Sequence, residues 1–99
     1  MIKSKKDIFT ILKDNQERIK NFGVKRLGVF GSVVHGRQRE ESDIDVLVEF
    51  EHEKKTFDNF IHLAFLLEKL FDRDVELITK ESLSPYLKPR VMGEVEYVI

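Results

Sequence analysis

Two aspartates stand two positions apart in a short segment of alternating character. Asp43 and Asp45 flank Ile44, and side chains two positions apart on a β-strand point to the same face, roughly 6.6 Å apart along the backbone. Two carboxylates on one face repel each other, so their placement makes physical sense when a cation lies between them. Mg²⁺ prefers oxygen ligands and commonly binds one or two protein carboxylates together with substrate phosphates. The pair therefore predicts a Mg²⁺ site.

A glycine and a serine, Gly31 and Ser32, end the apolar segment that precedes the aspartates. A short helix is expected to start behind this pair; glycine lets a backbone approach a ligand closely, and free N–H groups at a helix N-terminus bind anions. A third carboxylate, Glu76, alternates with Val75 and Leu77 and therefore faces away from them. It is a candidate to bind metal or to accept a proton from an attacking hydroxyl. Together these features predict a site for a nucleoside triphosphate and a divalent metal.

The elements that must position these residues follow from the hydrophobic periodicity and from the cap and turn residues. We predict strands over residues 24–30, 43–50 and 75–79. We predict helices over residues 4–21, 32–35 and 57–71, and a further helix that starts at Ser84-Pro85 and is limited by Pro89. The tail, residues 94–99, alternates again and is interpreted as a final strand or a helix tail.

The order of these elements predicts an α/β (α+β) fold with a small mixed sheet and helices packed mainly on one face. About a dozen residues join the first two strands, which suits either a hairpin or a crossover. The 99 residues suit one domain spanning 1–99 and leave no room for a second core. There are no repeats and no low-complexity segment.

The net charge, the absence of cysteine and the lengths of the apolar segments argue against several classes of protein. The formal net charge is −1, whereas nucleic-acid-binding proteins usually carry a basic excess, so a nucleic-acid partner is not expected. There are no cysteines, which excludes disulfides and thiolate metal sites and fits a cytoplasmic protein. The basic N-terminus lacks the apolar region of a signal peptide, and no apolar segment reaches the length of a membrane span.

The spacing of the candidate residues resembles a known signature. Gly31-Ser32, ten intervening residues and then Asp43-Ile44-Asp45 are similar to the G-S-x10-D-x-D pattern of the DNA polymerase β-like nucleotidyltransferase superfamily. The short chain and the later strand over residues 75–79 resemble its minimal nucleotidyltransferase (MNT) branch. The resemblance covers nearly the whole chain. It implies Mg²⁺-dependent transfer of a nucleoside monophosphate from an NTP, usually ATP, to a hydroxyl, with release of pyrophosphate.

The resemblance also implies a role for each matching residue. Gly31 and Ser32 would hold the triphosphate, and Asp43 and Asp45 would bind metal. Glu76 would occupy the third acidic position, in a site that can hold two metal ions.

Two positions depart from the family pattern. The third acid is more typically aspartate, and Glu76 is one methylene longer. Members often have arginine before the glycine that corresponds to Gly36, where this chain has His35. Arg37 or Arg39 is the candidate to supply the missing positive charge to the triphosphate.

Many MNT proteins are paired with a helical HEPT protein as a toxin–antitoxin system, and in some the MNT protein adenylylates a tyrosine of the toxin. Two hypotheses stay open from the sequence. One is an active nucleotidyltransferase that modifies a hydroxyl of such a partner. The alternative is a catalytically weak or inactive antitoxin that neutralises its partner by complex formation. Either hypothesis is compatible with a homo- or hetero-oligomer. Transfer to an RNA end or to a small molecule is a third option.

Each feature also has a purely structural interpretation. A glycine–serine pair alone is usually an ordinary turn, and aspartates at the start of a strand can simply be solvated. Glu76 can be a solvent-facing strand residue. The histidines show no metal-ligand spacing. The combination of the turn and the aspartates at this spacing favours the functional interpretation.

Overall fold

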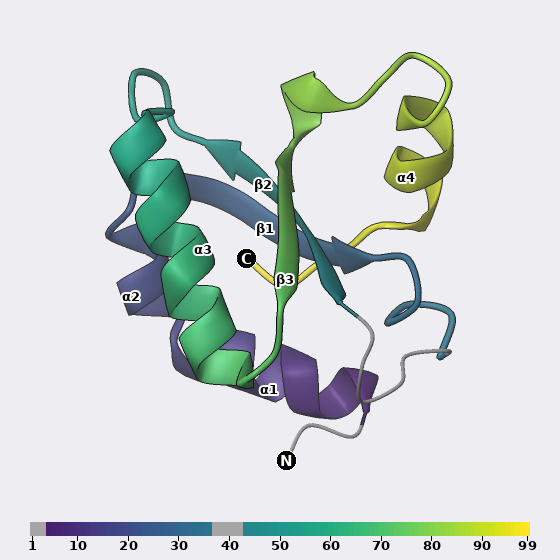
Figure 1. The fold of residues 1–99 in the computed structure, drawn as a ribbon, viewed down its shortest axis with the longest axis horizontal. Coiled ribbons are helices and arrows are strands. Elements are labelled where there is room, and N and C mark those ends of the chain that lie inside the picture. The colour runs from purple at the N-terminus through teal and green to yellow at the C-terminus, as the bar shows by residue number, and fades with distance from the viewer. Residues whose placement is uncertain (1–3, 37–42) are drawn as a thin grey trace.

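The computed structural model describes residues 4–36 and 43–99 and contains a mixed four-stranded sheet (Figure 1). Its strands, in the spatial order β3-β2-β1-β4, are β1 (Val24–Phe30), β2 (Ile44–Phe50), β3 (Val75–Thr79) and β4 (Glu96–Tyr97). β1 runs antiparallel to both β2 and β4, whereas β2 and β3 are parallel. The predicted α/β fold with a mixed sheet is confirmed, and the β1–β2 connection is antiparallel rather than a crossover.

The predicted helix over residues 4–21 is two helices, α1 (Lys5–Asp14) and α2 (Gln16–Lys20). Its expected cap is present, because the Asp7 N–H donates to Ser4 Oγ at 3.2 Å. The break falls at Asn15, whose side-chain Nδ2 donates to the Ile11 carbonyl at 2.8 Å. Asparagine offers the backbone such local hydrogen bonds in place of the helical ladder, which explains why one continuous helix was the wrong prediction.

Helix α3 (Phe57–Phe71) makes the crossover that parallel strands require. The Asn59 N–H donates to Thr56 Oγ1 at 3.1 Å, so the predicted cap is confirmed. On its inner side α3 buries apolar residues against one face of the sheet, together with α1 and α2. The fully buried residues of this core include Ile8, Leu12, Ile19, Leu27, Val29, Ile44, Val46, Val48, Leu63 and Leu67.

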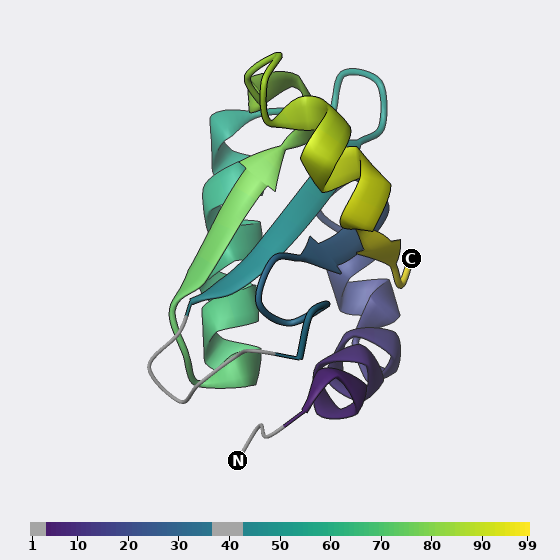
Figure 2. The ribbon, with the colours of Figure 1, turned by 90° about the vertical axis from the view of Figure 1, so that its right-hand side faces the viewer.

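Helix α4 (Lys88–Glu94) lies over the opposite face of the sheet (Figure 2). It starts after the predicted Ser84-Pro85, because Ser84 instead caps a turn in which its Oγ accepts from the Leu87 N–H at 3.2 Å. Pro89 does not limit the helix. It lies in the first turn, where its missing N–H has no helical partner to lose. A short 3₁₀ helix, η1 (Lys80–Ser82), precedes this segment.

The tail was expected to be a helix tail or a final strand, and it contains both. Glu94 is the last residue of α4, and Glu96–Tyr97 form β4. The expected helix over residues 32–35 is absent, and residues 31–36 form a turn. None of the helices in the described parts of the chain combines the length and the apolar character needed to cross a membrane.

Candidate active site

Two of the predicted carboxylates lie side by side on the face of the sheet opposite α1 and α3. Asp45 on β2 is in register with Glu76 on the parallel neighbour β3. Leu47, two positions after Asp45 on the same face, is fully buried, so the Asp45 carboxyl borders apolar surroundings. Burial raises the pKa of Asp45 from 3.8 to about 6, and a hydrogen bond and the charge of Glu76 add to the increase. The ionised form of Asp45 is therefore disfavoured, both by burial and by the neighbouring negative charge.

The glycine of the predicted phosphate turn packs directly against this aspartate. Gly31 has a φ of +71°, and a Cβ at this position would overlap a carboxylate oxygen of Asp45. Glycine is favoured here for two reasons, since other residues rarely adopt this φ and a Cβ would fit only if the Asp45 carboxylate moved aside. The turn at residues 31–32 and the β2 carboxylate thus form one continuous site, as the spacing predicted.

The other residues predicted for the site are not in direct contact with the Asp45–Glu76 pair in any interaction that the structure describes. Ser32 is half-buried in the turn that follows β1. Asp43 is exposed and comes immediately before β2, rather than within the predicted strand, but its charge also contributes to the raised pKa of Asp45. Arg37 and Arg39 lie outside the described residues.

A divalent cation suits this set of donors. Among the described residues, no group of three or more histidine and acidic side chains forms a ready-made metal cluster. Mg²⁺ does not need one, because it commonly binds one or two carboxylates and completes its shell with water and phosphate oxygens. Asp45 and Glu76 provide adjacent carboxylates with excess negative charge, and a cation would offset that charge.

A fourth carboxylate, which the sequence did not predict, reaches the glycine turn from α4. The Gly31 N–H donates to Glu94 Oε1 at 3.1 Å, and Nε2 of His35 donates to Glu94 Oε2 at 2.7 Å. The expectation that this turn offers free N–H groups is therefore wrong for Gly31. Glu94 lies in a tail that carries no recognisable motif, so no sequence signal connected it with a turn 63 positions earlier.

The two donors also lower the pKa of Glu94. The hydrogen bond from His35 lowers the pKa of Glu94, and the Gly31 N–H and the charge of Arg90 act in the same direction against the effect of burial. Glu94 is thus held as a carboxylate. Its charge contributes in turn to the raised pKa of Asp45.

The other end of the same sheet face carries a balanced polar group. The Tyr97 hydroxyl donates to Glu49 Oε2 at 2.9 Å, and the guanidinium carbon of Arg26 lies 3.6 Å from the centroid of the Tyr97 ring. Arg26 and Glu49 are also cross-strand partners. Opposite charges and a hydroxyl meet here, in contrast to the like charges around Asp45.

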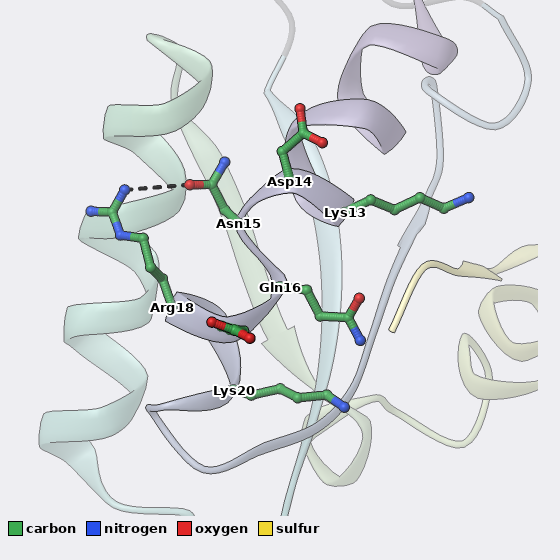
Figure 3. A pocket seen from close by; sticks show the side chains of 7 residues that line it. Lys13, Asp14, Asn15, Gln16, Arg18 and Lys20 are labelled. Atoms are coloured by element: carbon green, nitrogen blue, oxygen red, sulfur yellow. Dashed lines mark hydrogen bonds between the residues drawn. The ribbon is translucent and has the colours of Figure 1, made fainter.

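A surface hollow of about 590 Å³ lies at the junction of α1 and α2 and contains none of the predicted site residues (Figure 3). Charged and amide side chains of both helices line it, and Arg18 donates to Asn15 Oδ1 at 3.3 Å across one part. The break between the helices accounts for this hollow, and it adds nothing to the carboxylate site.

Known proteins are similar to this chain in both sequence and fold. The profile of the nucleotidyltransferase domain family matches residues 6–98. The protein adenylyltransferase MntA of Thermococcus cleftensis is 41% identical over 93 residues, which cover 93% of each chain. The structure of a candidate minimal nucleotidyltransferase is similar, with a TM-score of 0.74, 33% identity and coverage of 89% of this chain and 93% of that one.

A toxin–antitoxin structure with AMP-PNP is also similar, with a TM-score of 0.67 and 26% identity over 96% of this chain and 72% of that one. The family match extends over nearly the entire chain and includes every residue of the carboxylate site and of its glycine turn. This chain belongs to the nucleotidyltransferase domain family.

Proposed function

We propose that this protein is a Mg²⁺-dependent nucleotidyltransferase that transfers AMP from ATP to a hydroxyl of a HEPT-type helical partner, and that it acts as the antitoxin of the pair. The observation that carries the proposal is the adjacency of Asp45 and Glu76 on parallel strands, with the positive-φ Gly31 packed against the Asp45 carboxylate. Like charges concentrated beside a turn with a close backbone approach suit a metal-bound triphosphate.

Each residue has a distinct task in this proposal. Asp43 and Asp45 would hold Mg²⁺ together with Glu76, and Ser32 and the glycine turn would bind the triphosphate. Bound Mg²⁺ would offset the negative charge of the triphosphate and of the departing pyrophosphate. Glu76 is exposed and next to Asp45, so it is also suited to accept the proton of the attacking hydroxyl.

The proposed transfer needs no reactant other than ATP and the hydroxyl. The acceptor oxygen forms a bond to the α-phosphorus of ATP, the bond from that phosphorus to the bridging oxygen breaks, and pyrophosphate leaves with its electron pair. The hydroxyl proton passes to the carboxylate. A protein acceptor is supported by the name of the Thermococcus relative, a protein adenylyltransferase, and a toxin partner by the similar toxin–antitoxin structure.

The test uses the purified protein, ATP labelled at the α-phosphate, Mg²⁺ and the protein encoded beside it. We expect label on the partner, lost when Asp43→Ala and Asp45→Ala are combined, because the metal then lacks its site. Glu49→Gln is the matched control, since Glu49 lies on the same strand and face but in the balanced group. Transfer that persists in the double variant contradicts the proposal, as does absence of label with the unaltered protein.

Exposed aromatic residues support the alternative, a binding module that acts by complex formation. On α3, Phe57 is 77% exposed and Phe65 is 58% exposed, whereas the neighbouring Leu66 is buried. Both side chains lie on the same helix, and exposed apolar surface marks a protein contact where it forms a continuous patch. If the double alanine variant neutralises the partner as fully as the unaltered protein, complex formation alone accounts for the antitoxin role.

A further inference from the structure

The contact between Glu94 and the glycine turn has a specific geometry. Glu94 is the last residue of α4, and its two carboxylate oxygens accept from two different points of one turn, the Gly31 N–H and Nε2 of His35. The Glu94 side chain is 16% exposed and that of His35 is 39% exposed. Hydrogen bonds to a charged group are roughly twice as strong as neutral ones, and water competes less where the group is partly buried.

The turn itself has little internal support. Among described residues, its backbone hydrogen bonds run from the His35 N–H to the Gly31 carbonyl and from the Gly36 N–H to the Val33 carbonyl, both at 3.2 Å. Its first and last residues are glycines with positive φ, and glycine has the widest range of conformations when it is not restrained. Val33 anchors the middle of the turn in the core, so a contact from outside the turn acts on its two ends, at Gly31 and at His35.

We propose that Glu94 is a positioning residue for the nucleotide: it ties the turn at residues 31–36 to the end of α4 through Gly31 and His35. This inference rests on the proposed function, because it assumes that the turn binds the triphosphate. The Ser32 N–H donates to no other described residue and Ser32 is half-buried, so this N–H remains as a donor for a phosphate oxygen while Glu94 occupies the Gly31 N–H. A turn held in one conformation binds its ligand without the cost of ordering it first.

Glu94 could also act in the opposite way, as a competitor of the nucleotide, and the two roles predict opposite effects of removing it on nucleotide binding. A carboxylate on the Gly31 N–H resembles a phosphate oxygen, so Glu94 could instead occupy a phosphate subsite and compete with ATP. In that case its removal tightens nucleotide binding. In the positioning role its removal loosens the turn and weakens binding.

The first experiment measures AMP-PNP binding with Mg²⁺ by calorimetry, together with kcat and KM for ATP. We expect Glu94→Ala to weaken binding and to raise KM about tenfold, with kcat changed less than about threefold, because the turn is positioned in fewer molecules. Glu94→Gln keeps an acceptor for the Gly31 N–H and should recover most of the affinity. Glu96→Gln is the matched control, since Glu96 is two positions away and pairs instead with Lys5.

The second measurement is the amide signal of Gly31 in a ¹⁵N-correlated NMR spectrum, which needs neither nucleotide nor transfer. Loss of its bond to a carboxylate should shift this signal in Glu94→Ala, while it stays close to its original position in Glu96→Gln. Equal or tighter AMP-PNP binding by Glu94→Ala, or an unmoved Gly31 signal, overturns the positioning role. Weaker binding by Glu94→Ala, in a protein that transfers no label, contradicts the proposed transfer and leaves the positioning role intact.

Discussion

Strand β2 carries two carboxylates on one face, and they lie in opposite electrostatic surroundings. Glu49 accepts a hydrogen bond from the Tyr97 hydroxyl at 2.9 Å, and Arg26 on the neighbouring strand covers the Tyr97 ring. Asp45 lies instead beside Glu76, with the charges of Asp43 and Glu94 close enough to raise its pKa further. The same strand thus presents one balanced and one unbalanced acid.

The difference shows what separates a structural carboxylate from a candidate ligand. An acid that serves the fold alone is stabilised by donors or by opposite charge, as Glu49 is. Acids concentrated against one another oppose folding and persist where a ligand compensates for them, which is why perturbed carboxylates cluster at functional sites.

Neutralising each acid of β2 should have very different effects on transfer. We expect Asp45→Asn to lower the transfer rate by at least about a thousandfold, because it removes a proposed metal ligand. Glu49→Gln should lower it by less than about threefold, since it disturbs only the balanced end. Initial rates of label transfer measure both variants. Similar losses in the two would show that position on β2, rather than the charge imbalance, decides function.

Two glycines of the same turn separate backbone strain from the packing against Asp45. Gly36 has a φ of +68°, and a Cβ there would meet no atom of the described residues within 4 Å, whereas Gly31 shares the positive φ and its Cβ would meet Asp45. We expect Gly36→Ala to cost about 1–2 kcal/mol of unfolding free energy and Gly31→Ala more than about 3 kcal/mol. Urea unfolding gives both values. Equal costs would contradict the close contact with Asp45.

Stability in the absence of metal should depend on pH through Asp45. Because its pKa is raised to about 6 in the folded protein, the protonated form is favoured. The associated stability is fully present below about pH 4 and is lost as the pH rises through about 6. We expect Asp45→Asn to be more stable than the unaltered protein at pH 7.5 by about 1 kcal/mol, after allowance for partial solvent exposure.

That difference corresponds to about 4–8 °C in Tm and should disappear near pH 4. Thermal unfolding with a chelator present, at a series of pH values, provides the measurement. A lower Tm for Asp45→Asn at pH 7.5 would mean that its ionised carboxylate stabilises the fold.

The smallest effect concerns the balanced end. Tyr97→Phe removes the hydroxyl that donates to Glu49 and leaves the ring under Arg26. We expect a loss of about 1 kcal/mol of unfolding free energy and transfer activity within about twofold of the unaltered protein. Chemical unfolding and initial rates measure the two quantities. A large loss of activity would extend the functional site along the whole face of the sheet.

Local patterns predicted the parts of the site that depend on neighbouring residues. Alternation along the chain assigned Asp45 to the face opposite Ile44 and Val46, and both of these are buried in the core. The glycine–serine turn at the end of β1 lies against Asp45, as its spacing indicated. The facing of Glu76 followed from the same period of two.

Features that depend on tertiary contacts were not predictable in this way. The bond from Gly31 to Glu94 spans 63 positions, and nothing in the tail distinguishes a carboxylate that will reach the turn. The break at Asn15 has a different, local origin, since the Asn15 side chain donates to the Ile11 carbonyl in competition with the helical hydrogen bonds. The roles assigned to the site residues, Arg37 and Arg39 among them, stay predictions.

The crossover through α3 means that Asp45 and Glu76 become neighbours only when β2 and β3 pair. A chain in which β2 and β3 are unpaired does not hold these acids side by side, so the proposed site for a metal-bound nucleotide forms together with the native sheet. A ligand that binds only the paired state adds stability by mass action, about 2.7 kcal/mol at a hundredfold excess over its Kd. Under the proposed function, occupancy of the site would then depend on how much of the protein has its native sheet.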